Sequence, residues 1–185
     1  PDEKENIHEV LMPTPIDGKF GPSLTKSMLN FLLPVDENKP LVTQISSYLK
    51  DEAKLYNCPS VAMYGDNEPF LIKHIPDWFA MARDAGFLDI MAISNGSVMT
   101  ESLAERILDS GLTRLRFSLD AVTPETYAKI RIGGKFTRTI RNIEMFLNAR
   151  ARRGSKLPQV GVNFVKMSIN QHELKPFMKR WEDVV

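Results

Sequence analysis

Two periodicities alternate along most of the chain. Short apolar runs bounded by glycine, proline or polar residues predict buried strands, and longer segments with apolar residues three and four positions apart predict amphipathic helices. The predicted strands cover residues 61–64, 90–93, 115–119 and 160–167. Strands and helices that take turns in this way are typical of βαβ units, so the sequence predicts an α/β fold with a parallel sheet.

The predicted helices have clear boundary signals. Pro76 suits the first turn of a helix over residues 75–85, and Gly86 suits its C-terminal cap. Thr100 is predicted to cap a helix that Gly111 ends. Further helices are predicted over residues 41–56, 123–131 and 171–181, and between Gly134 and Gly154.

The chain divides into two parts in this reading. Residues 1–40 are interrupted by prolines and show no sustained period, so they form an N-terminal segment without a clear assignment. Residues 41–185 form the regular α/β part. Right-handed crossovers allow either a doubly wound sheet or a barrel, and periodicity does not choose between them.

Composition narrows the classes of function. The 185 residues include 24 basic and 23 acidic side chains, a formal net charge of +1, which gives no reason to expect nucleic acid or an acidic membrane as partner. No apolar run is long enough to span a bilayer and no signal-peptide pattern opens the chain, so we expect a cytoplasmic protein. The first residue is Pro1 rather than methionine, which suggests a sequence that is processed or incomplete at its N-terminus.

The cysteine and histidine content does not indicate a disulfide or a metal site. Cys58 is the only cysteine, so the chain holds no intrachain disulfide and no cysteine cluster. The three histidines are scattered without metal-ligand spacing, and no metal ligand or catalytic residue is assigned.

Polar residues follow each predicted strand at its carboxyl end. Because such ends share one side of a parallel sheet, the set predicts a ligand site. The members are Gly65, Asp66, Asn67, Glu68, Ser94, Asn95, Gly96, Ser118, Asp120, Asn163 and Lys166.

Each member also has a purely structural interpretation. Asp66 and Asn67 are common turn residues, and Asp120 is placed to cap the next helix. Arg131 precedes two glycines, where it suits either bidentate carboxylate binding or a solvated helix C-terminus.

The ordered motifs resemble a known family. Residues 65–69 resemble the Gly-Glu-Pro turn of radical S-adenosylmethionine (SAM) enzymes, and residues 94–96 resemble their Thr-Asn-Gly. Residues 116–121 and 129–134 resemble the Ser-(Ile/Leu)-Asp strand and the Ile-Arg-x-Gly segment that are familiar from the SPASM-type branch. The resemblance implies that residues 41–185 form the second to fifth strands of a partial (β/α)6 TIM-like barrel.

The resemblance also implies roles for the polar set. Glu68 would bind the SAM amino group, with residues 65–67 shaping the turn and Asn95 among the cofactor contacts. Arg131 would pair with the SAM carboxylate. Ser118 and Asp120 would face the ribose or methionyl end, and Asn163 would line the adenosine side.

The implied cofactors are SAM and a [4Fe–4S] cluster, whose electron cleaves SAM so that the adenosyl radical takes a hydrogen atom from a small-molecule or peptide substrate. An electron donor such as flavodoxin or ferredoxin would be the partner. The Cys-x-x-x-Cys-x-x-Cys loop of the family is absent, because residues 33–40 contain no cysteine. Either residues are missing from the sequence, or the chain is a relative without the redox chemistry.

Three hypotheses therefore remain. The first is a radical SAM enzyme that this chain represents incompletely. The second is a catalytically silent barrel that binds a nucleoside-like ligand or a partner protein. The third is an α/β enzyme with acid–base chemistry at Glu68 and Asp120, against which no histidine or second carboxylate is obviously paired with either residue.

Overall fold

The computed structural model describes residues 44, 47, 50, 51, 60–64, 68–182 and 184. These residues build a four-stranded parallel sheet in the order β1-β2-β3-β4, so strands that follow one another in sequence are also neighbours in space. The strands are β1 (Ser60–Ala62), β2 (Asp89–Ser94), β3 (Arg114–Ser118) and β4 (Gln159–Asn163). The predicted α/β fold with parallel βα repeats is confirmed.

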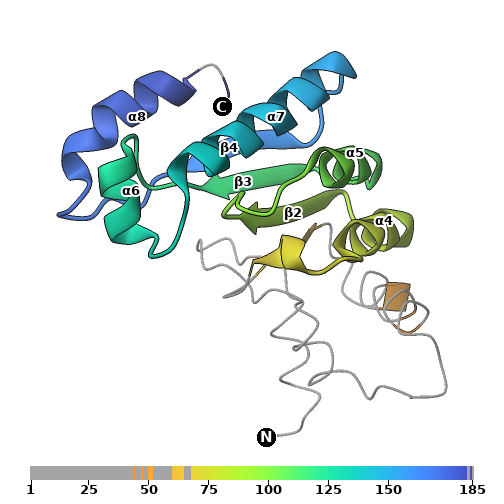
Figure 1. Ribbon diagram of the computed structural model, residues 1–185. Coiled ribbons are helices and arrows are strands. Elements are labelled where there is room, and N and C mark those ends of the chain that lie inside the picture. Colours follow the sequence, from red (N-terminus) through yellow and green to blue (C-terminus); the bar gives the residue numbers. More distant parts are fainter. Residues whose placement is uncertain are drawn as a thin grey trace, which may run out of the picture.

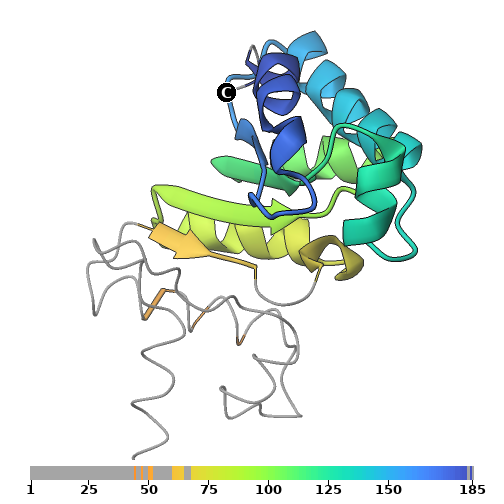
Figure 2. The ribbon, with the colours of Figure 1, turned by 90° about the vertical axis from the view of Figure 1, so that its left-hand side faces the viewer.

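Helices connect the strands and cover one face of the sheet. Figure 1 shows α4 (Ile75–Ala85), α5 (Glu101–Asp109) and α7 (Phe136–Arg152) side by side on that face. Figure 2, seen from the left of Figure 1, brings α6 (Pro124–Ile130) and α8 (Leu174–Trp181) forward, around the ends of the strands. Two short 3-10 helices, η1 (Pro69–Leu71) and η2 (Gln171–Glu173), precede α4 and α8.

The helix boundaries agree with the local signals. Gly86 ends α4 in the left-handed region at φ 99°, a conformation that glycine adopts without steric cost. Thr100 and Thr123 cap α5 and α6 by accepting backbone N–H groups of the first turn. The helix predicted over residues 171–181 begins as η2 and becomes α-helical only at Leu174.

The strand ends are less well predicted. β4 stops at Asn163, so the prediction that Lys166 lies on this strand is wrong. The reason is that the Val165 N–H donates to the Asp120 carboxylate at 2.7 Å instead of to a neighbouring strand. β1 stops at Ala62, although the Met63 N–H still donates to the Met91 carbonyl at 2.8 Å.

Several predictions fall outside the described residues. They include the boundary near residue 40 and the positions of Cys58, Gly65, Asp66 and Asn67. Of the helix predicted over residues 41–56, four residues are described and all four are helical.

The core lies between the sheet and its helices. Leu115 and Phe117 of β3 are fully buried, and the Phe117 ring meets Phe146 of α7 edge-on at 5.9 Å. Burying a side chain of this size contributes about 2–3 kcal/mol, so these contacts fix which face of β3 points to the helices. Arg116 and Ser118, which alternate with them, point to the opposite face. In the described part of the chain, no helix is long and apolar enough to cross a bilayer.

Candidate functional site

Glu68 connects the turn after β1 to the end of β2. Its Oε1 accepts the Ser94 hydroxyl at 2.7 Å and the Phe70 N–H at 3.2 Å, and its Oε2 accepts the Asn95 N–H at 2.6 Å. These three bonds fix a half-buried carboxylate beside the carboxyl end of β2. Bonds to an ionised acceptor are among the stronger ones, so the turn and the strand end are held as one unit.

Asn142 of α7 hydrogen-bonds to the loop that follows β2. Asn142 is buried, and its side-chain amide donates to the carbonyl oxygens of Gly96 at 2.9 Å and Ser97 at 3.3 Å. Within the loop, the Asn95 side chain accepts the Ser97 N–H at 2.8 Å, which is the expected turn geometry. Asn142 was not among the predicted site residues. In the sequence it is marked only as a polar residue between the inward positions Ile140 and Ile143 and as part of the Asn-Ile pair that continues the family resemblance.

Asp120 organises the end of β3. It is 3% exposed and has a φ of 63°, the only positive φ of a non-glycine residue in the described part of the chain. Its Oδ1 accepts the Val165 N–H at 2.7 Å, and its Oδ2 accepts the Arg131 guanidinium at 2.5 Å. Asp120 does not cap the following helix, as one interpretation allowed, because the Thr123 hydroxyl does so.

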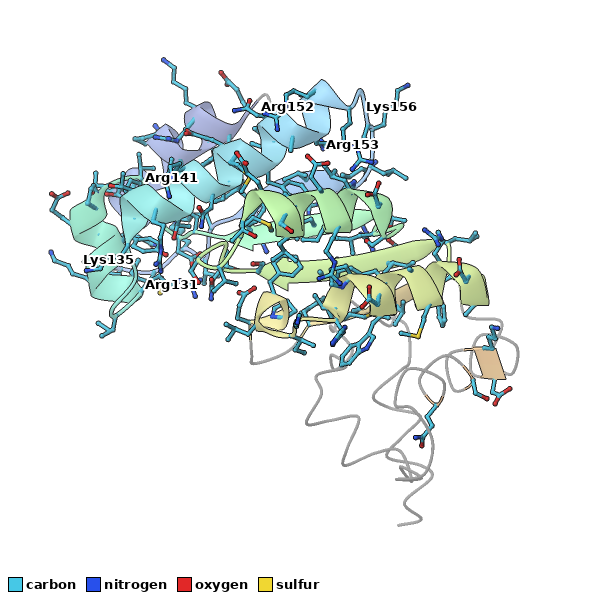
Figure 3. The ribbon with its side chains drawn as sticks, turned by 45° about the vertical axis from the view of Figure 1, so that its right-hand side comes forward. Arg131, Lys135, Arg141, Arg152, Arg153 and Lys156 are labelled. Atoms are coloured by element: carbon cyan, nitrogen blue, oxygen red, sulfur yellow. The ribbon has the colours of Figure 1, made fainter. Side chains whose placement is uncertain are left out.

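Arg131 lies at the end of α6 with its guanidinium directed to Asp120. Its side chain is 34% exposed, and its Nε is buried without a hydrogen-bond partner among the described residues. Figure 3 shows Arg131 at the strand-end side of the sheet, whereas Arg152, Arg153 and Lys156 lie at the far end of α7. The ion pair therefore orients a cation that keeps unused N–H donors at the predicted site.

Ser118 and Asn163 complete the strand ends of β3 and β4. They are register partners, and both side chains are half-buried. The Asn163 carbonyl accepts the N–H groups of Leu119 at 3.3 Å and Asp120 at 3.4 Å, so the two strand ends stay together up to the point where Asp120 turns.

Two buried polar residues, Asn170 and Glu173, hydrogen-bond to Asp120 and to the segment that follows it. Asn170 is fully buried, and its amide donates to the carbonyls of Asp120 and Val165 at 2.9 Å each. Glu173 accepts the Val122 N–H at 2.6 Å and the Thr123 hydroxyl at 2.5 Å.

The environment of Glu173 favours its charged form. Burial of the Glu173 carboxyl acts to raise its pKa, but the hydrogen bonds from Thr123 and Val122 outweigh burial, and the pKa is lowered. The carboxylate is thus ionised near neutral pH and holds the Val122–Thr123 segment that follows Asp120.

Apart from Gly96 and Lys166, the described residues of the polar set lie, together with Arg131, in two groups at adjacent strand ends. One consists of Glu68, Ser94 and Asn95. The other consists of Ser118, Asp120, Arg131 and Asn163. Asp120 is engaged by Arg131 and Val165, with no histidine or second carboxylate bonded to it in the described residues, so the acid–base hypothesis gains no support. No group of three or more His, Cys, Asp or Glu side chains that would hold a metal occurs among the described residues.

Comparisons with known proteins agree with this architecture. The family model of the radical SAM superfamily matches residues 42–175. One solved structure, anSMEcpe with bound AdoMet, superposes with a TM-score of 0.56 at 18% identity and covers 75% of this chain and 38% of that chain. At this identity the likeness shows the fold, a partial TIM-like barrel.

Several curated relatives share more sequence. The probable GTP 3',8-cyclase of Methanocaldococcus jannaschii is 34% identical over 117 residues, covering 63% of this chain and 37% of the relative. The GTP 3',8-cyclase of Desulforamulus reducens is 28% identical over 118 residues, 63% of this chain and 34% of the relative. The AdoMet-dependent heme synthase of Methanosarcina barkeri is 32% identical over 113 residues, 59% of this chain and 31% of the relative.

The matches share one family but differ in activity. The chain spans about a third of the length of these curated relatives, and their names do not point specifically to the SPASM-type branch. Members of the matched family use SAM and a [4Fe–4S] cluster. The strand-end motifs, the parallel βα repeats and a match over residues 42–175 lead to one conclusion: this chain belongs to the radical SAM superfamily.

Proposed function

We propose that this chain forms the SAM-binding part of a radical SAM enzyme, with the methionyl headgroup of SAM between Glu68 and Arg131. The observation that carries the proposal is the pairing of a fixed carboxylate at the end of β2 with an oriented guanidinium beside the end of β3. An amino acid headgroup carries one ammonium and one carboxylate, so it needs one anion and one cation.

Both groups retain bonding capacity for the headgroup. An ionised carboxylate offers about four acceptor positions, and Glu68 uses three of them. A guanidinium has five N–H donors, and the bond to Asp120 uses one on Nη2, which leaves the other Nη N–H groups for a ligand. We assign Glu68 to the ammonium and Arg131 to the carboxylate.

The remaining strand-end residues line the same site in this proposal. The Ser118 hydroxyl would add a donor near the carboxylate, and Asn163 would line the adenosine side. Asn95 and the turn of Gly65, Asp66 and Asn67 would shape the ammonium side. Asp120 acts as a positioning residue, because its carboxylate is engaged by Arg131 and Val165.

The [4Fe–4S] cluster does not fit the residues of this chain. Such a cluster in this family requires three thiolates, and Cys58 is the only cysteine in the 185 residues. We therefore assign no redox step to these residues. Cleavage of SAM, the chemistry that the cluster supplies in the family, would need thiolates from outside these residues.

The single cysteine also favours a second candidate function. The chain would then belong to a protein that binds SAM or a similar nucleoside without redox chemistry. Intact mass, followed by iron and sulfide analysis of the anaerobically purified native protein, separates the two candidates. About four iron atoms per chain support the enzyme, and an iron-free protein of 21.0 kDa supports the binding module.

The substrate follows from family membership only in outline. We propose a small-molecule substrate and a reductant such as flavodoxin or ferredoxin, in line with relatives named as GTP 3',8-cyclases and a heme synthase. A SPASM-type extension rests on the motif resemblance alone.

Calorimetric titration with SAM tests the proposed site. Glu68→Ala and Arg131→Ala should each weaken binding by about 10- to 100-fold, because each removes a charge-assisted bond worth about 1.5–3 kcal/mol. Arg141→Ala, on the exposed side of α7, is the matched control and should bind like the wild type. Unchanged affinity in both site variants would reject the pose.

A further inference from the structure

Arg116 is a cation on the sheet face opposite the helices. It lies between Leu115 and Phe117, whose side chains are fully buried against the helix layer. Arg116 therefore shares the other face with Ser118, two residues further along β3 and roughly 7 Å away at about 3.3 Å per residue. In a barrel this face is the inner one. The Arg116 side chain therefore starts two residues before the strand end at which the SAM site is proposed.

The neighbouring strand makes room for this guanidinium. Arg116 is the register partner of Gly161 on β4. A Cβ at position 161 would lie 1.8 Å from the Arg116 Nη1 and 2.8 Å from its Cζ, closer than any side chain permits. Gly161 does not have the left-handed φ that would by itself favour glycine. The Arg116 guanidinium therefore occupies the space that a side chain at position 161 would fill.

Two arginines near Arg116 have carboxylate partners. Arg114 donates its Nε to Asp89 at 2.8 Å and its Nη2 to the other oxygen of the same carboxylate. Arg131 is paired with Asp120. Among the described residues, Arg116 makes neither a hydrogen bond to a carboxylate nor an ion pair.

Within the part of the chain that the structure describes, no carboxylate supplies the missing negative charge. An arginine cannot discharge itself, and a half-buried cation without a partner is costly. The favourable solution is an anion that enters from the inner side of the barrel.

We infer that Arg116 is a specificity-determining residue that binds an oxyanion group, a carboxylate or a phosphate, of the small-molecule substrate. A planar guanidinium binds either group in a bidentate manner. The inference rests on the proposed function, because only a SAM site at the strand ends makes this face the substrate side. It adds the chemical class of substrate that the site accepts.

The test uses protein saturated with SAM and two anion probes, pyrophosphate and succinate, titrated while the arginine side-chain N–H signals are followed by NMR. Wild-type protein should bind at least one probe saturably. Arg116→Ala should weaken that binding at least tenfold, while Arg141→Ala should change it less than twofold. Preference for pyrophosphate assigns a phosphate substrate, and preference for succinate assigns a carboxylate substrate.

Gly161→Ala provides a test that leaves every charge in place. The added methyl group displaces the guanidinium, so this variant should also weaken probe binding at least tenfold. The double variant Arg116→Ala/Gly161→Ala should bind no worse than Arg116→Ala alone, because nothing remains to displace. If Gly161→Ala does not fold, the comparison of Arg116→Ala with Arg141→Ala still decides.

Three results would overturn the inference. They are equal probe binding by wild type and Arg116→Ala, an equal loss in Arg141→Ala, and a loss of SAM affinity in Arg116→Ala that would place the residue in the SAM site. Failure of the wild-type protein to bind SAM would instead contradict the proposed function, so the two failures are distinguishable.

Discussion

Asp120 and Arg131 form a 2.5 Å ion pair between the end of β3 and the end of α6. The pair depends on an unusual backbone: Asp120 has a φ of 63°, a conformation that costs a non-glycine residue of order 1 kcal/mol. Bonds from Val165 and Asn170 hold this conformation in place. This backbone conformation places the Asp120 carboxylate where it accepts both the Val165 N–H and the Arg131 guanidinium.

Asp120→Asn should separate this positioning role from side-chain size. Asparagine tolerates the same backbone but carries no charge, so Arg131 loses its orienting partner. We expect the free energy of unfolding, measured in urea, to fall by about 1–2 kcal/mol. We also expect a several-fold weaker affinity for SAM. The matched control is Asp84→Asn, which breaks an exposed ion pair with Arg83 and should change stability by less than about 0.5 kcal/mol.

Asn142→Ala should loosen the loop that presents Asn95. The substitution leaves the buried Gly96 carbonyl and the partly buried Ser97 carbonyl without their donor, which costs about 1–3 kcal/mol. Asn148→Ala, at an exposed position of the same helix, should be nearly neutral. Equal denaturation midpoints for the two variants would mean that Asn142 does not support the loop.

Glu173→Gln should remove a pH-dependent part of the stability. Because the pKa of Glu173 is lowered in the folded state, its contribution is fully present above the unfolded pKa of 4.5 and is lost as the pH falls through the folded value. At pH 7 the variant should be less stable by about 1–3 kcal/mol, and the difference should shrink below pH 4.5. Glu125→Gln, exposed on α6, serves as control. A difference independent of pH would contradict a lowered pKa.

Local signals explain which parts of the fold were predictable. Pro76 and Gly86 mark both ends of α4, and both signals act within the segment itself. The convergence of Glu68, Asp120 and Asn163 at one edge followed from parallel topology alone, which fixes the direction of every strand end.

Long-range partners explain what the sequence left undetermined. β4 ends early because Val165 bonds to Asp120, which lies 45 residues earlier in the chain. Asn142 and Asn170 gain their roles from loops 46 and 50 residues away. The Arg116 side chain occupies the space beside Gly161 because the two residues are register partners on adjacent strands. No residue near either position in the sequence predicts this contact.

The most direct measurement compares SAM with decarboxylated SAM, which lacks only the headgroup carboxylate, by calorimetry on the wild type, Arg131→Ala and Glu68→Ala. The proposed pose predicts that the wild type and Glu68→Ala prefer SAM by about tenfold or more, and that Arg131→Ala binds the two ligands equally, because it lacks the group that recognises the carboxylate. An Arg131→Ala variant that keeps the full preference for SAM would contradict the placement of the headgroup between Glu68 and Arg131.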